Sequence, residues 1–160
     1  MKRDTRYQGA IVQDGRLLLI KALDHQDGQL FWLIPGGGRE DGESEEACVR
    51  REMREETHLE VERLLVEMAA FPEDTTYQRY KTYLCRVVGG EARPGSEPED
   101  AMAPLSTMLE ISWFDLEEME GWDPLLVSTP YTYPQVVRIR EALINGKLQS
   151  ASPFDPAKRV

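Results

Sequence analysis

The sequence contains few of the residues that mark several large classes of protein. Cys48 and Cys85 are the only cysteines among 160 residues, too few for a disulfide framework and without the C-x-x-C spacing of zinc sites. The longest apolar runs, such as residues 17–20, are far too short to span a bilayer. Residues 1–8 are charged and lack an apolar core, so no signal peptide is expected. These absences predict a cytoplasmic protein with no membrane partner.

Positive charge is also in short supply. Lys and Arg number 19 against 29 Asp and Glu, which gives a formal net charge of −10. Because such a surface repels phosphate backbones, a nucleic acid polymer is not expected as a partner. A small anionic molecule could bind only through a local basic patch or a bound cation.

Apolar runs and turn residues divide the chain into strands and helices. Strands are expected at residues 6–13, 16–23, 30–34, 59–71, 76–88 and 105–114, with Asp14-Gly15 as a tight hairpin turn. Helices are expected at residues 44–58, 115–120 and 133–144. Because no linker divides the chain, one domain is expected over residues 1–149, followed by a loosely held tail at 150–160.

The helix expected at residues 44–58 carries clustered acidic residues. Glu52, Glu55 and Glu56 stand at i, i+3 and i+4, so their carboxylates share one face of the helix. Like charges at this spacing destabilise a helix by about 0.2–0.5 kcal/mol per pair, and a hard cation such as Mg²⁺ would compensate for this. Acidic residues on a helix are more often a solvated face, balanced here by neighbouring arginines. The glycines at 36–38 allow a sharp turn and close approach to a ligand.

The spacing of these residues resembles the signature of the Nudix hydrolases, G-x5-E-x7-R-E-U-x-E-E-x-G-U, in which U is a bulky aliphatic residue. The matching positions are Gly37, Glu43, Arg51, Glu52, Met53, Glu55, Glu56 and Leu59. His58 departs from the signature, since it stands where the family has glycine. A histidine adopts left-handed backbone more readily than most residues, so a structural substitution is expected there.

The resemblance implies an α+β fold, a Nudix-type α/β/α sandwich with a mixed central β-sheet. It also implies a metal-dependent pyrophosphohydrolase that cleaves a phosphoanhydride bond in a nucleoside diphosphate linked to another moiety. Dinucleoside polyphosphates, nucleoside triphosphates and nucleotide sugars all stay open as substrates. The implied partners are Mg²⁺ or Mn²⁺ and a small nucleotide, with a homodimer as an option. The alternative is a catalytically silent domain of the same fold that binds a nucleotide or regulates another protein.

The resemblance also implies roles for individual residues. Glu52, Glu55 and Glu56 would hold the metal, and Glu43 and Arg51 would fix the geometry of the loop and helix; these five form the expected catalytic set. A fourth metal ligand is expected at Glu110, with Glu97, Glu99 and Asp100 as alternatives. The residues expected to bind substrate are Gly37, Gly38, Tyr77 and Arg79. For Tyr77 packing on the sheet stays an alternative, and for Arg79 simple exposure to solvent does.

Overall fold

A computed structural model describes residues 5–70, 79–95 and 106–144. The strands are β1 (Thr5–Gln13), β2 (Arg16–Asp24), β3 (Leu30–Leu33), β4 (Gly36–Gly37), β5 (Leu59–Ala70), β6 (Arg79–Gly90) and β7 (Ser106–Asp115). The helices are α1 (Glu45–Thr57), α2 (Pro124–Val127) and α3 (Thr132–Ile144), with a 3-10 turn η1 at Met119–Gly121. Tyr77 and the tail expected at 150–160 lie outside the described residues.

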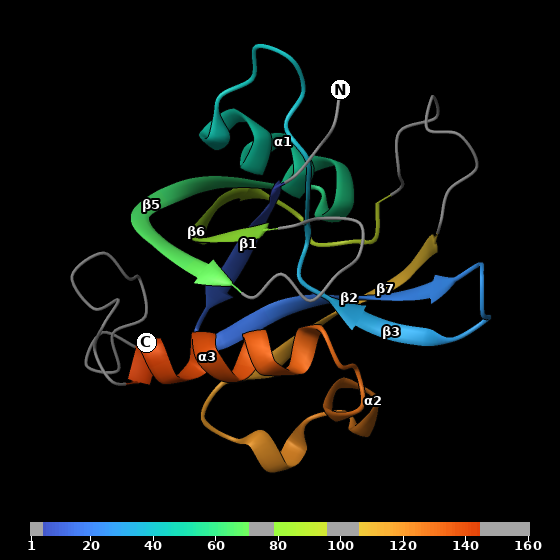
Figure 1. Cartoon of the computed structure of the whole chain (residues 1–160). Coiled ribbons are helices and arrows are strands. Elements are labelled where there is room, and N and C mark those ends of the chain that lie inside the picture. Colours follow the sequence, from blue (N-terminus) through green and yellow to red (C-terminus); the bar gives the residue numbers. More distant parts are fainter. Residues whose placement is uncertain (1–4, 71–78, 96–105, 145–160) are drawn as a thin grey trace.

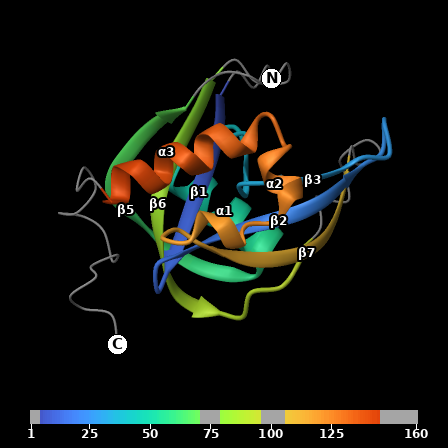
Figure 2. The same ribbon diagram turned by 90° about the horizontal axis from the view of Figure 1, so that it is seen from below.

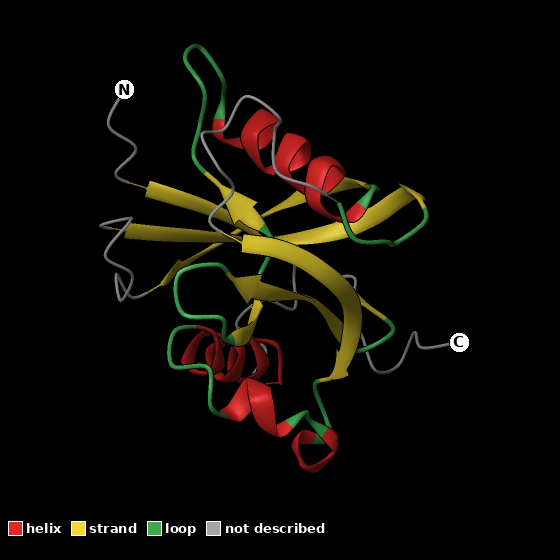
Figure 3. Cartoon of the chain, turned by 90° about the vertical axis from the view of Figure 1, so that its right-hand side faces the viewer, coloured by secondary structure: helices red, strands yellow, loops and turns green. Residues whose placement is uncertain are grey.

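The strands of the described segments form one mixed, seven-stranded sheet. Their order is β3-β2-β1-β6-β5, with β4 paired to β1 and β7 paired to β2. β1 and β6 run parallel, whereas the other pairs are antiparallel. Helix α1 lies on one face of the sheet and α3 on the other, as Figure 1 shows and Figure 3 repeats from the side. The expected α+β sandwich with a mixed central sheet is therefore confirmed.

The hairpin between β1 and β2 follows from its two turn residues. Asp14 and Gly15 both have positive φ, 52° and 74°, and Gln13 lies opposite Arg16 in the register. Positive φ at both central positions matches the twist of the flanking strands, and it favours the Asp-Gly dipeptide. The hairpin predicted from these two residues is confirmed.

The core lies in two layers, one on each side of the sheet. β2 contributes to both, because successive side chains of a strand point to opposite faces. Leu18 and Ile20 pack against Met53 of α1, whereas Leu17 and Leu19 pack in the cluster that includes residues of α3. Figure 2 shows α3 lying across that second face. The unbroken apolar run at 17–20 thus reflects a strand that is buried on both faces.

The segment after β7 differs from the expectation. A helix at 115–120 is wrong, since the chain bends after Asp115 and only the short turn η1 forms. Asp115 accepts a hydrogen bond from the Glu117 backbone at 2.8 Å, and Leu116 is fully buried, so this stretch turns inward instead of coiling. Helix α2 was not expected, although Asp123 before Pro124 is a typical helix start. None of the described helices is both long and apolar enough to cross a membrane.

Candidate active site

The acidic helix α1 begins and ends at residues suited to its two ends. The Ser44 hydroxyl accepts a hydrogen bond from the Ala47 N–H at 3.1 Å and caps the first turn. At the other end His58 has φ 62° and ψ 17°, and its N–H donates to the Arg54 carbonyl at 3.1 Å. This left-handed cap is the conformation that glycine usually supplies. His58 therefore takes the structural place expected of it.

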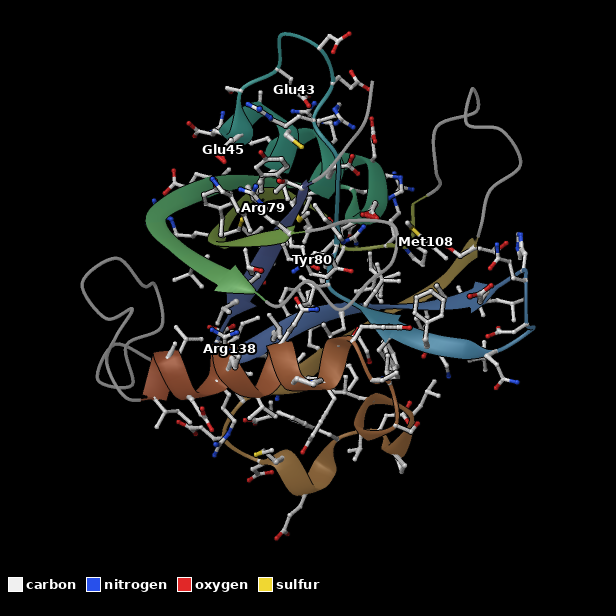
Figure 4. The ribbon with its side chains drawn as sticks, in the orientation of Figure 1. Glu43, Glu45, Arg79, Tyr80, Met108 and Arg138 are labelled. Carbon is white, nitrogen blue, oxygen red and sulfur yellow. The ribbon has the colours of Figure 1, made fainter. Side chains whose placement is uncertain are left out.

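Arg51 gathers the carboxylates around one guanidinium group. Its Nε donates to Glu43 Oε2 at 2.7 Å, and its Nη2 donates to Glu43 Oε1 at 3.0 Å. Its Nη1 donates to Glu52 Oε1 at 2.9 Å and to Glu55 Oε2 at 3.2 Å. Hydrogen bonding with Arg51 lowers the pKa of Glu43, and hydrogen bonding with Glu43 raises the pKa of Arg51. The loop before α1, where Figure 4 labels Glu43, is thereby tied to the middle of the helix.

The backbone of the glycines before α1 lies against the side chains of this cluster. The Gly36 N–H donates to Glu56 Oε1 at 2.8 Å, inside the protein. A Cβ at Gly37 would collide with the carboxylate of Glu52, and the Gly38 carbonyl accepts from Arg51 Nη2 at 3.1 Å. Only glycine at 37 lets the helix side chains approach the backbone this closely. The position of the carboxylates therefore depends on the Gly-rich turn.

Glu52 is the most deeply buried carboxylate that Arg51 contacts. It is 9% exposed, and no donor in the described segments reaches its Oε2. Burial raises the pKa of Glu52, the charge of Glu55 raises it further, and Arg51 offsets this only in part. Because Glu43, Glu52 and Glu55 share one guanidinium, and Glu40 lies 3.9 Å from it, the carboxylates at this point outnumber the single positive charge.

The donor set at this point suits a hard divalent cation. Carboxylate oxygens are the ligands that Mg²⁺ and Mn²⁺ prefer, and a partly buried cluster with surplus negative charge would gain from a cation. Among the described residues no three His, Cys, Asp or Glu side chains already converge on a common point. Here Glu52 and Glu55 both turn toward Arg51, and Glu56 turns toward Gly36. The residues thus fit a metal chemically, and their role as ligands stays a prediction.

The other expected site residues are placed differently. Glu110 lies on β7 with 55% of its side chain exposed, and its ion pair is with Lys21 Nζ at 3.8 Å. Arg79 is exposed at the first position of β6, opposite Thr5 of β1 (Figure 4). The alternatives Glu97, Glu99 and Asp100 lie outside the described residues. The expectations for these positions stay predictions.

Two contacts at the ends of α1 could not be inferred from sequence spacing. Glu45 accepts hydrogen bonds from Lys81 Nζ and the Tyr83 hydroxyl, each at 2.9 Å. Burial tends to raise the pKa of Glu45, but these two bonds outweigh it and the pKa is lowered. The second contact lies at the other end, where the Arg93 and Gly95 N–H groups donate to carbonyls of the last turn.

Cys48 belongs to the packing of α1. It is fully buried and forms no disulfide. Burial, with the nearby charges of Glu52 and Glu43, raises the pKa of its thiol to about 12. A thiol in this environment is unreactive, so Cys48 is a small core residue of the helix.

Comparison with known proteins assigns the chain to a family. Residues 5–133 match the family model of the NUDIX domain. A protein of Mycobacterium tuberculosis named "Putative 8-oxo-dGTP diphosphatase 2" is 29% identical over 119 residues, which cover 71% of this chain and 81% of that protein. The chain therefore belongs to the Nudix hydrolase family and is an enzyme of that family.

Solved structures agree with this assignment. A MutT Nudix hydrolase of Burkholderia pseudomallei is 29% identical, with a TM-score of 0.54 and coverage of 84% of this chain and 97% of that one. An ADP-ribose pyrophosphatase of Streptococcus suis has a TM-score of 0.62 at 24% identity, with 96% of each chain covered. The second likeness extends the shared fold over nearly the whole chain.

Proposed function

We propose that the protein is a metal-dependent pyrophosphohydrolase that cleaves a phosphoanhydride bond in a nucleoside diphosphate linked to another moiety. The observation that carries this proposal is the cluster around Arg51, where one guanidinium holds Glu43, Glu52 and Glu55 above the Gly-rich turn. Surplus negative charge in a half-buried place has no folding advantage, because like charges repel and burial penalises them. Binding of a cation would explain why these carboxylates lie together.

The side chains have separate tasks in this proposal. Glu52, Glu55 and Glu56 supply oxygens to Mg²⁺ or Mn²⁺, which would neutralise the diphosphate and acidify a water molecule. Arg51 keeps two of these carboxylates in place, and its bidentate contact with Glu43 prevents the preceding loop from moving away. Glu110 on β7 is proposed as a further ligand. A chain of net charge −10 can thereby accept an anionic substrate.

The nucleotide is proposed to be a small cytoplasmic molecule. Nucleoside triphosphates, oxidised ones included, come first, since a relative 29% identical to this chain carries the name of an 8-oxo-dGTP diphosphatase. Dinucleoside polyphosphates and nucleotide sugars follow. Gly37, Gly38 and Arg79 are the described residues proposed to meet the substrate, and Tyr77 is proposed with them.

The test is product release from a panel of these nucleotides with Mg²⁺, with Mn²⁺ and with a chelator. We expect turnover of at least one class that needs the metal and that stops with the chelator. A folded protein that binds Mn²⁺ but hydrolyses none of the panel would favour the silent nucleotide-binding domain instead. Glu46→Gln is a suitable control, since Glu46 lies on the same helix in a solvated pair with Arg50 at 3.7 Å.

A further inference from the structure

The chain returns to the C-terminal end of α1 after β6. The Arg93 N–H donates to the Thr57 carbonyl at 3.0 Å, and the Gly95 N–H donates to the Glu56 carbonyl at 2.9 Å. A Cβ at Gly95 would collide with the Glu55 carbonyl oxygen, so only glycine allows this approach. Figure 1 shows this segment, which follows β6, passing beside the end of α1. It satisfies carbonyls of the last helical turn that have no partner within the helix.

His58 connects the helix to the same segment. Its ring Nδ1 lies 3.1 Å from the Arg93 carbonyl oxygen. Since a carbonyl only accepts, Nδ1 carries the proton and donates this hydrogen bond. The Gly90 backbone also approaches closely, because a Cβ there would collide with the His58 carbonyl oxygen. Residues 90–95 therefore pass close to His58, whose backbone lies against Gly90 and whose ring bonds to Arg93.

A histidine at this position needs an explanation. Glycine adopts φ 62° without steric cost, whereas a residue with a Cβ adopts it less readily. The Nudix signature has glycine at this point, and this chain carries a less favourable residue instead. What histidine adds is the bond to Arg93, which glycine cannot form.

We propose that His58 is a positioning residue whose imidazole latches residues 93–95 onto the last turn of α1 and so holds Glu55 and Glu56 for catalysis. Both glutamates lie in this turn, and Glu56 is held from two sides. Its carbonyl accepts from Gly95, and its carboxylate accepts from the Gly36 N–H. When residues 93–95 detach, the last turn of α1 loses the hydrogen bonds from Arg93 and Gly95, and the carboxylates of Glu55 and Glu56 are no longer held in one position. The catalytic part of this inference rests on the function proposed above, but the latch itself does not.

Two substitutions of His58 separate the ring contact from the backbone conformation. His58→Gly keeps the left-handed cap and removes the donor. His58→Asn also tolerates that conformation, and its Nδ2 stands as many bonds from the backbone as the imidazole Nδ1. Hydrogen exchange should be about twofold to tenfold faster at the Arg93 and Gly95 amides in His58→Gly. It should stay near the wild-type rate in His58→Asn, and neither variant should lose global stability.

Kinetics then test the positioning role. In His58→Gly we expect kcat to fall at least about threefold with KM unchanged, because the carboxylates are displaced while the nucleotide contacts remain. His58→Asn should restore kcat. Unchanged exchange in His58→Gly overturns the latch, and faster exchange with unchanged kcat overturns the positioning of the glutamates. If the wild-type protein hydrolyses no nucleotide, the proposed function fails and the exchange rates alone decide on the latch.

A second pair of variants reaches the segment without touching His58. Gly95→Ala places a Cβ against the Glu55 carbonyl and should release the same two amides. Gly121→Ala is its matched control, since a Cβ at Gly121 meets nothing within 4 Å. Protected Arg93 and Gly95 amides in Gly95→Ala would contradict the close packing on which the latch depends.

Discussion

Replacing Arg51 by lysine tests the central contact of the site. Lysine keeps the positive charge but loses the planar fork that binds carboxylates through two parallel bonds. The guanidinium makes five hydrogen bonds to oxygen of 3.2 Å or less, four to carboxylates and one to the Gly38 carbonyl. An ammonium group has three N–H donors, so at least two of these bonds are lost.

The cost follows from where these bonds lie. A hydrogen bond to a charged group contributes roughly 1.5–3 kcal/mol. The Arg51 side chain is 18% exposed, so water replaces part of what is lost. We therefore expect the lower end of the range, about 3–4 kcal/mol for the two bonds together. With a urea m-value near 2 kcal/mol per M, the midpoint should fall by about 1.5–2 M.

The assay is urea unfolding at neutral pH with a chelator present, so that metal binding does not mask the change. Arg54→Lys is the matched control. Arg54 lies on the same helix and makes two bonds to Glu60, at 2.6 and 3.2 Å, but its side chain is 57% exposed. Exposed pairs contribute little, so its midpoint should barely move. Equal shifts for the two variants would refute the reasoning that the burial of the Arg51 cluster makes it matter.

Three further substitutions probe the site and the opposite layer. Glu55→Gln should lower kcat by about 100-fold or more, because Glu55 is a proposed metal ligand. It should leave the urea midpoint near that of the wild type, because it removes one charge from a partly exposed carboxylate. Gly37→Ala should displace the Glu52 carboxylate and reduce turnover about tenfold or more, measured with saturating Mg²⁺. The Leu125 N–H holds the pKa of Asp123 below its usual value, so Asp123→Asn should lower the urea midpoint at pH 7. That difference should begin to shrink as the pH falls below about 3.9, where the unfolded carboxyl takes up a proton, and should vanish only below the lowered pKa of the folded state.

Each of these substitutions has its own control. Glu46→Gln should keep full turnover, and an equal loss there would show that any charge on α1 affects the rate. Gly121→Ala serves for Gly37→Ala, since its added methyl group meets open space. For Asp123→Asn the pH series is the control, because a difference that does not shrink at all below about pH 3.9 would exclude the lowered pKa as its cause.

Much of the fold could be anticipated because its signals are local. The hairpin at Asp14 and Gly15 depends on two residues that adopt positive φ. Helix α1 begins after a serine that caps its first turn and ends at a residue suited to left-handed backbone, so its bounds were expected within one residue. The expectation of a helix at 115–120 rested on the acidic residues of this stretch. It did not take into account the turn in which Asp115 accepts from the Glu117 backbone, or the burial of Leu116.

The sequence alone was enough to identify the family, through residues spaced along one helix and the turn before it. Spacing on a helix is a local property, and it placed Glu52, Glu55 and Glu56 on one face. The partners of these side chains depend on contacts between distant segments. Glu45 meets Lys81 because β1 and β6 run parallel beneath α1, and no local pattern determines which strands become neighbours.

The same limit applies to Glu110 and to His58. Local sequence could mark each as exceptional, but the strand order places Glu110 beside Lys21, and the return of the chain after β6 places Arg93 beside the imidazole. Tertiary structure decided these pairings because they join residues 35 or more positions apart, where only the packing of the whole sheet sets the distance.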